Sequence, residues 1–369
     1  MAYNRCAMGI SMRSYAKINL GLCIGARRTD GFHELRTVYQ TIALHDVIEI
    51  ELVRGGGIEI RCADERVPKD SSNTCYRMIE RAMEVLRERG RVVVHIEKRL
   101  PVQGGLGGAS GNAVAALLGL ERVLKKSLSG ERKLELAAEI GSDLPLFLLG
   151  GAVLGVGRGE EVYPLSDLGE MVCVVALPEV GVSTPQAFRD WDDWGRKPGS
   201  DVSKGAAEAV TFHKACLRRS AKRHGPVSTQ AELTLTEASD RISEFGRRVS
   251  GWLSGLSQLQ TGKVLSGVPG SLGRGRAGNP LLDLVRTGIE NDFELVVFPR
   301  YPELREVKRT LERAGAFYAS LSGSGSALYG LFASQAAAKK AVERLGKIGI
   351  PSVITKTLGR RQYWKKWLV

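Results

Sequence analysis

The stretch LPVQGGLGGASGNAVAALLGL, residues 100 to 120, decides how the rest of the chain is interpreted. Five glycines fall within positions 104 to 111, and an alanine-rich segment with helical spacing follows at once. The preceding run RVVVHIEKRL, residues 91 to 100, is typical of a strand, so the local order is strand, glycine loop, helix.

Glycines at the start of a helix let backbone N–H groups converge on an anion, because no Cβ blocks the approach. The stretch therefore suits a phosphate, although a tight strand-to-helix connection without a ligand would have the same pattern. It is not a Walker loop, because no Lys-Ser or Lys-Thr follows the glycines.

Length and composition point to a globular enzyme. The chain has 369 residues, 43% of them hydrophobic, which is enough for one large domain or two ordinary ones. Its longest apolar runs, such as residues 113–120 and 171–177, are far shorter than a membrane span. The first residues lack the pattern of a signal peptide, so we expect a cytoplasmic protein without a membrane partner. The six cysteines form no CxxC pair and do not suggest a structural zinc site.

The segments around the glycine loop predict an α+β chain. Residues 13–62 contain alternating polar and apolar runs, from which we expect several short strands. Helices are expected over 71–89, with Ser72-Asn73 as the cap, over 131–142 and from Thr184 onward, and further helices and strands over 302–357. The simplest architecture has two α+β domains, residues 1–170 and 171–369.

A basic segment at about residues 196–279 interrupts the second domain. Between Arg196 and Pro280 the sequence has 14 Lys or Arg against 6 Asp or Glu, more than half of the formal net charge of +13. The segment is also rich in Gly and Ser, so we expect a mobile insertion that leaves catalysis intact. The alternative is a nucleic-acid-binding segment, but it has few aromatic residues and no RRM, KH or zinc-finger pattern.

Several motifs together resemble the GHMP kinases, the family of galactokinase, homoserine kinase and mevalonate kinase. RLPVQGGLGGASGNAVAAL, residues 99–117, is similar to their central phosphate-binding motif. SYAKINLGLCIGARRTDGFHELRTVYQ, residues 14–40, is similar to the N-terminal signature of the GHMP kinases that act on 4-diphosphocytidyl-2-C-methyl-D-erythritol. The remaining landmarks follow in family order: IGSDLPLFLLGG (140–151), VSTPQAF (182–188), NDFE (291–294) and SLSGSGSALYGLF (320–332).

This resemblance implies both a fold and a reaction. The fold is an N-terminal domain of ribosomal-protein-S5 type and a C-terminal ferredoxin-like domain, with ATP and a cytidine-diphosphate substrate in the cleft between them. The reaction is transfer of the ATP γ-phosphoryl group to the 2-hydroxyl of 4-diphosphocytidyl-2-C-methyl-D-erythritol, a step of the non-mevalonate isoprenoid pathway. Mg²⁺ is expected because the charge of ATP must be neutralised, although the sequence displays no ligand set for it.

By the same resemblance Lys17 and Asp143 are the catalytic pair. Asp143 matches the aspartate that accepts the hydroxyl proton, and Lys17 matches the lysine that keeps it ionised and offsets charge on the phosphoryl group. From the residues alone, Asp143 could instead cap a helix, and Lys17 could face solvent from a strand. Asn19 lies on the same strand face as Lys17 and is expected to bind the erythritol hydroxyls.

Four residues match the substrate pocket of the family. Phe32 and His33 match the segment in which an aromatic ring stacks on cytosine and a histidine bonds its polar edge. Many relatives have tyrosine where Phe32 stands. Thr184 and Phe188 match positions that line the same pocket. Without the resemblance, Phe32 would be interpreted as a core aromatic residue and His33 as a turn histidine.

The glycine loop matches the family motif but departs from it at two positions. Relatives commonly have Gly-Gly-Gly-Ser-Ser-Asn where residues 107–112 are GGASGN. Ala109 is tolerable only with a negative φ, and Gly111 lacks a hydroxyl that could contact phosphate or Mg²⁺. A third motif, SGSGSAL at residues 322–328, is expected to pack near the loop. The residues assigned to the ATP phosphates are Pro101, Gly104, Gly105, Leu106, Gly107, Gly108, Ala109, Ser110, Gly111 and Asn112.

Two other interpretations of the motifs stay open from the sequence. One is a different small-molecule kinase of the GHMP family, against which the cytidine-reading segment DGFHEL, residues 30–35, argues. The other is a catalytically impaired relative, which Gly111 suggests and the presence of both Lys17 and Asp143 opposes. The sequence indicates neither the oligomeric state nor the residues that contact adenine.

Overall fold

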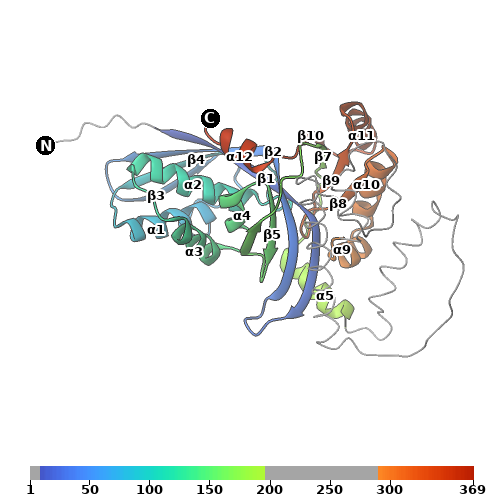
Figure 1. Ribbon diagram of the computed structural model, residues 1–369, viewed down its shortest axis with the longest axis horizontal. Coiled ribbons are helices and arrows are strands. Elements are labelled where there is room, and N and C mark those ends of the chain that lie inside the picture. Colours follow the sequence, from blue (N-terminus) through green and yellow to red (C-terminus); the bar gives the residue numbers. More distant parts are fainter. Residues whose placement is uncertain (1–8, 196–289) are drawn as a thin grey trace, which may run out of the picture.

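The computed structural model describes residues 9–195 and 290–369 (Figure 1). The basic segment expected at 196–279 lies outside these residues, so both interpretations of it stay predictions. The described chain forms two sheets with helices packed against each, which confirms the α+β class expected from the sequence.

The first sheet is built around a long hairpin. Its order is β3-β4-β2-β5-β6, and β1 pairs with β2 in antiparallel fashion. The expectation of short strands is wrong here, because β1 has 18 residues and β2 has 21. Both faces of β1 are buried along most of its length, and register shifts such as that between Tyr15 and Ala16 bend the pair without ending it. The strands are Ile10–Arg27 (β1), His33–Val53 (β2), Gly57–Cys62 (β3), Arg91–Glu97 (β4), Ala152–Val156 (β5) and Glu161–Pro164 (β6).

Helices pack against the first sheet and form its core. The expected Ser-Asn cap is confirmed, since the Asn73 side chain accepts a hydrogen bond from Cys75 N at the start of α1. α2 is buried along most of its length, and its small residues allow close packing on the sheet. A Cβ on Gly119 would lie only 2.8 Å from the Ile50 side chain. The helices are Thr74–Leu86 (α1), Gly108–Leu124 (α2), Gly130–Ile140 (α3) and Leu144–Leu149 (α4).

The second sheet has the order β10-β7-β9-β8, and every neighbouring pair is antiparallel. With α10 and α11 as the connections, this is the β-α-β-β-α-β arrangement of ferredoxin-like folds. α10 and α11 pack on this sheet, and α5 and α9 lie next to each other at its edge (Figure 1). The elements are Val172–Ala176 (β7), Thr184–Gly195 (α5), Glu294–Arg300 (α9), Pro302–Arg313 (α10), Tyr318–Leu321 (β8), Leu328–Phe332 (β9), Gln335–Lys347 (α11) and Ser352–Lys356 (β10).

The two halves share an apolar junction in which β1 is the common wall. Ala16, Ile18 and Leu20 from β1 cluster with Val175 and Tyr329 from the second sheet. Leu100, just before the glycine loop, and Leu106, within it, belong to the same cluster. Lys17 and Asn19 alternate with these apolar residues, so their side chains project from the other face of β1. None of the helices in the described ranges is long and apolar enough to cross a membrane.

The C-terminal end returns to the first half as α12, Arg360–Lys365. The fully buried Tyr363 donates its hydroxyl hydrogen to Phe147 O at 2.7 Å, and Trp364 Nε1 donates to Leu149 O at 3.0 Å. These contacts hold α4, the helix that follows Asp143 directly. The division into domains at residue 170 stays a prediction.

We expect Tyr363→Ala to lower the free energy of unfolding by about 3–5 kcal/mol, because it leaves a large cavity between α12 and α4. Tyr363→Phe keeps the ring and removes one hydrogen bond, so its cost should be about 1 kcal/mol. Urea denaturation of both variants measures the difference. Equal losses for the two variants would mean that the packing of the ring does not secure the C-terminal end.

Candidate active site

The glycine loop leads into α2 at the junction of the two halves. The N-cap residue Gly107 has a left-handed φ of 70°, and no side chain caps the helix. A Cβ at Gly107 would lie 2.9 Å from the Phe147 ring and 3.0 Å from Lys17 Cγ, which favours glycine at this position. The first N–H groups of α2 are thus left available, as in helix termini that bind anions.

The second glycine-rich turn, residues 322–326, packs directly on the first. Ser322 Oγ donates to Gly105 O at 3.0 Å, and Ala327 N donates to Gly104 O at 3.2 Å. A Cβ on Gly105 would lie 2.0 Å from Ser322 O, so any side chain there would separate the two turns. The packing of the third motif beside the glycine loop, expected from the resemblance, is confirmed.

Lys17 is buried at this point, with 3% of its surface exposed. Its Nζ lies 2.7 Å from Asn19 Oδ1 and 3.4 Å from Asp143 Oδ2. The backbone N–H of Lys17 also donates to Leu106 O at 2.9 Å, which ties the strand to the glycine loop. A buried ammonium requires such partners, and the solvent-facing alternative for Lys17 is therefore wrong.

Asp143 stands at the N-cap position of α4 but makes no side-chain capping bond. Its carboxylate instead accepts a hydrogen bond from Tyr39 Oη at 3.0 Å and faces Lys17, with 33% of the side chain exposed. The capping interpretation is therefore wrong. The group is held by two protein partners while part of it stays open to solvent or substrate.

Tyr39 is a site residue that the sequence analysis missed. Burial, followed by the nearby Asp143 carboxylate, raises the pKa of Tyr39 well above its ordinary value, so its hydroxyl stays protonated and donates. Gly155 and Gly159 make room for the side chain, since a Cβ at either would lie 2.5 Å from it. Tyr39 is the cross-strand partner of Asn19, but this register depends on the bulges in β1 and could not be read from the sequence.

The amide of Asn19 is engaged by the protein. Oδ1 accepts from Lys17, and Nδ2 donates to Thr37 Oγ1 at 2.8 Å. Only 1% of Asn19 is exposed. The side chain thus fixes the direction of the Lys17 ammonium, and binding of substrate hydroxyls by Asn19 stays a prediction.

The four expected substrate residues are not all brought together. The His33 ring stacks on Phe188 with centroids 5.0 Å apart and planes at 10°, and His33 Nε2 lies 2.7 Å from Asp192 Oδ1. Phe32 is 51% exposed and its ring lies under the Arg158 guanidinium, 5.0 Å from the centroid. Asp192 was missed by the sequence analysis, which had no pattern to connect it with a histidine 159 positions earlier.

Thr184 connects α5 to the second glycine-rich turn. Its hydroxyl lies 2.7 Å from Ser324 Oγ in the second glycine-rich turn. Thr184 is also the first residue of α5, the helix that carries Phe188. The start of α5 is therefore fixed against the same turn that packs on the phosphate loop.

The residues assigned to the phosphate loop play different structural parts. Asn112 is 3% exposed, and its Nδ2 donates to the buried Asp46 carboxylate at 3.0 Å. The same carboxylate accepts from Lys98 Nζ at 2.8 Å and from Arg99 N and Leu100 N at 2.7 Å each. Asn112 thus anchors the base of the loop to Asp46 in β2, which also holds the segment that leads from β4 into the loop. Two further members also support the turn: Leu106 in the core, and Pro101, whose ring would meet a Cβ on Gly104.

The two departures from the family motif have local explanations. Ala109 is exposed in the first turn of α2. It is not among the residues with positive φ, so the negative φ that an alanine needs at this position is present. A Cβ on Gly111 would lie 2.8 Å from Ser14 Oγ and 3.0 Å from Tyr15 O. Glycine at position 111 therefore matches a close approach of α2 to β1.

Two family models match the chain. The model of the GHMP kinases N terminal domain matches residues 73–151, and that of the GHMP kinases C terminal matches 277–350. A 4-diphosphocytidyl-2-C-methyl-D-erythritol kinase from Solibacter usitatus (strain Ellin6076) is 35% identical over 336 residues, which cover 91% of this chain and 85% of the relative. A kinase of the same name from Caldicellulosiruptor bescii is 29% identical over 348 residues, covering 94% and 98%.

Solved structures show the same likeness over nearly the whole length. A 4-(cytidine 5'-diphospho)-2C-methyl-D-erythritol kinase superposes with a TM-score of 0.63 at 26% identity, covering 95% of this chain and 100% of that one. A homoserine kinase from Cytophaga hutchinsonii shares the fold, with a TM-score of 0.64 at 20% identity over 97% of each chain. Fold and site define an ATP-dependent small-molecule kinase of the GHMP type.

Within that class, the chain belongs to the family of 4-diphosphocytidyl-2-C-methyl-D-erythritol kinases.

We expect Gly111→Ala to lower the free energy of unfolding by about 1–3 kcal/mol, because the added methyl group must displace Ser14 or the backbone of Tyr15. The matched control is Gly346→Ala in α11, where a Cβ would meet nothing within 4 Å. That change should instead stabilise by up to about 1 kcal/mol through helix propensity. Thermal or urea unfolding measures both, and stabilisation by Gly111→Ala would contradict the packing explanation.

Proposed function

We propose that the chain transfers the γ-phosphoryl group of ATP to the 2-hydroxyl of 4-diphosphocytidyl-2-C-methyl-D-erythritol, in the non-mevalonate pathway to isoprenoid precursors. The observation that carries the proposal is the Lys17–Asp143 pair, buried on one side and open on the other, beside a helix N-terminus framed by two glycine loops. The relatives support this acceptor over that of another GHMP kinase. The nucleic-acid alternative rested on a segment outside the described residues.

In the proposed reaction, Asp143 accepts the proton of the acceptor hydroxyl as the phosphoryl group arrives. Its Oδ1 is occupied by the Tyr39 hydroxyl, so Oδ2 is the oxygen that we assign as the base. The Lys17 ammonium lies 3.4 Å from that oxygen and offsets the negative charge that develops on the phosphoryl group. Asn19 Oδ1 accepts a hydrogen bond from the ammonium and so helps to fix its position.

The ATP phosphates would lie against the first turn of α2 and the glycines of residues 104–108, where N–H groups can stabilise them. No group of three or more His, Cys, Asp or Glu side chains in the described ranges could hold a metal ion by itself. Mg²⁺ bound to ATP keeps phosphate and water ligands and needs only one or two protein oxygens. We assign the Ser110 hydroxyl to this part, and the ion would supply charge neutralisation.

His33 and Phe188 are the proposed cytosine-reading pair. The Asp192 carboxylate at Nε2 would hold the His33 proton on that nitrogen and leave Nδ1 as an acceptor for an amino group. Cytosine offers such an exocyclic amino group. Phe32, exposed at the turn, is positioned to stack on the base from outside. A cytoplasmic location accords with a small-molecule kinase and remains part of this proposal.

An ADP-release assay with ATP, Mg²⁺ and 4-diphosphocytidyl-2-C-methyl-D-erythritol tests the function. We expect turnover with this acceptor and none with free methylerythritol phosphate, because the latter lacks the cytidine group. Asp143→Asn should lower kcat by about 10²–10⁴-fold, the usual contribution of a general base. Equal turnover of both acceptors, or full activity of Asp143→Asn, would contradict the proposal.

Tyr39→Phe tests the assignment of the base. Removing one hydrogen bond to a charged group should lower kcat by about tenfold or more, while KM for both substrates changes by less than about threefold. Tyr15→Phe is the matched control, because it removes a buried hydroxyl that bonds Lys366 O at 2.8 Å and makes no contact with Asp143. The control should keep its kcat. A similar fall in both variants would show that the effect comes from general destabilisation.

A further inference from the structure

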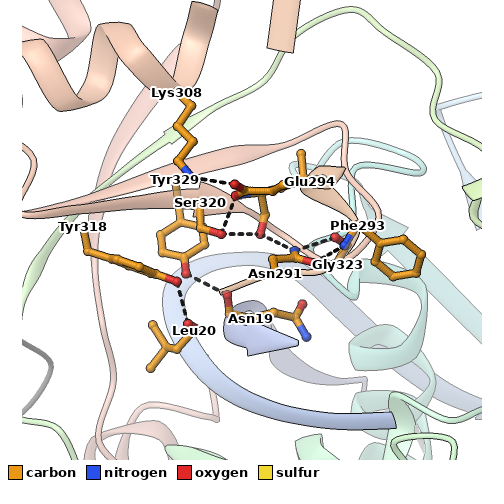
Figure 2. Close-up of polar contacts among 11 residues, drawn as sticks. Asn19, Leu20, Asn291, Phe293, Glu294, Lys308, Tyr318, Ser320, Gly323 and Tyr329 are labelled. Atoms are coloured by element: carbon orange, nitrogen blue, oxygen red, sulfur yellow. Dashed lines mark hydrogen bonds and ion pairs between the residues drawn. The ribbon is translucent and has the colours of Figure 1, made fainter. Parts of the chain in front are cut away.

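A polar network outside the Lys17–Asp143 pair joins the second half of the molecule to β1 (Figure 2). The Tyr329 hydroxyl donates to Asn19 O and the Tyr318 hydroxyl donates to Leu20 O, each at 2.7 Å. Burial, followed by the nearby Glu294, raises the pKa of Tyr318 to about 12, so this hydroxyl stays protonated. The backbone just after Lys17 is thus held by two tyrosines of the second sheet.

Asn291 lies at the centre of a second set of bonds, to the glycine-rich turn (Figure 2). It is 2% exposed, and its Nδ2 donates to Leu321 O at 2.9 Å and to Gly323 O at 2.8 Å. Its Oδ1 accepts from Phe293 N at 3.1 Å. Two carbonyls on one side and an N–H group on the other can be satisfied only by an amide in this orientation.

Gly323, which Asn291 holds, lies beside Lys17. Its φ is +58°, and a Cβ on it would lie 3.4 Å from Lys17 Nζ and 3.6 Å from Asn19 Oδ1. The adjacent Ser322 bonds Gly105 in the phosphate loop. A displacement of this turn would therefore alter both the space around the ammonium and the support of the phosphate loop.

The backbone around Asn291 is itself fixed to β1. Leu22 N donates to Glu290 O and Asp292 N donates to Leu22 O, both at 2.9 Å. Ile24 N donates to the Asp292 carboxylate at 2.8 Å. Asn291 therefore connects the strand that carries Lys17 with the turn that packs on the phosphate loop.

The neighbouring Glu294 braces the strand but does not reach the turn. Its carboxylate accepts from Ser320 Oγ at 2.8 Å and from Leu321 N at 2.9 Å, and it pairs with Lys308 Nζ at 2.5 Å. Burial alone would lower the pKa of Lys308, but the Glu294 carboxylate outweighs it and raises that pKa, so the pair stays charged. Ser320 thus offers a buried polar group of the same network that has no contact with Gly323.

We propose that Asn291 is a positioning residue for phosphoryl transfer, which holds Gly323 against Lys17 and, through Ser322, keeps the phosphate loop in register with β1. The inference rests on the proposed function for the part that concerns catalysis. The reason for a catalytic effect is geometric: a shift of about 1 Å in a positioned group can cost about a hundredfold in rate.

Two variants of Asn291 test the proposal. Asn291→Ala removes the amide, and Asn291→Asp keeps its shape but replaces the N–H donors with an oxygen that repels the two carbonyls. In the ADP-release assay we expect kcat to fall by about tenfold to a hundredfold in both, with KM for both substrates within about threefold. The control Ser320→Ala should lower the melting temperature and keep kcat within about twofold, since the hydroxyl bonds the Glu294 carboxylate and, at 3.4 Å, Leu321 O, but makes no bond to Gly323.

A second measurement does not depend on the identity of the acceptor. Hydrogen exchange followed by mass spectrometry should show faster exchange over residues 101–108 in Asn291→Ala than in wild type, and no such change in Ser320→Ala. If wild type is inactive with the cytidylated acceptor, the proposed function fails, whereas this comparison still decides the inference about the loops. Unchanged exchange in the phosphate loop, or a kcat that falls equally in the Asn291 and Ser320 variants, would overturn it.

Discussion

The burial of the Lys17 ammonium between the two halves of the molecule is the constraint on which the rest of the site depends. A charge removed from water must be compensated at close range. Asn19 and Asp143 supply that compensation at 2.7 Å and 3.4 Å. Asp143 is in turn oriented by Tyr39 and placed by α4, whose far side is fixed by the C-terminal Tyr363. The C-terminal end of the chain thus supports the ammonium group indirectly, through α4 and Asp143.

The glycines at the site allow neighbouring segments to approach closely, in addition to giving the backbone conformational freedom. Gly107 lets α2 begin beside Lys17, and Gly105 lets the second turn contact the first through backbone atoms. Gly323 leaves space next to the ammonium itself. With side chains at these positions the two turns would be pushed apart. The proposed phosphate site is therefore built by both halves of the molecule and not by the central loop alone.

The sequence predicted the elements that depend on local patterns and motifs. The strand–loop–helix unit, the cap at Asn73 and the packing of the third motif were all predicted, and the structure contains them. The lengths predicted for β1 and β2 were too short. Alternation between polar and apolar residues does not mark the extent of a strand that is buried on both faces. The sequence analysis also overlooked Tyr39 and Asp192, whose roles come from partners 104 and 159 positions away.

The sequence by itself determined the α+β class, the family and the candidate catalytic pair, because these depend on short motifs whose residue types and order are visible in one dimension. Only the tertiary structure decided what those residues do in detail. It turned Asn112 toward Asp46 and away from the loop opening, and it committed Asn19 to Lys17 and Thr37. It also placed Asn291 between β1 and the second glycine turn. The physical reason is that an amide can bond whichever groups the folded chain brings within about 3 Å, and that choice is made by packing over long sequence separations.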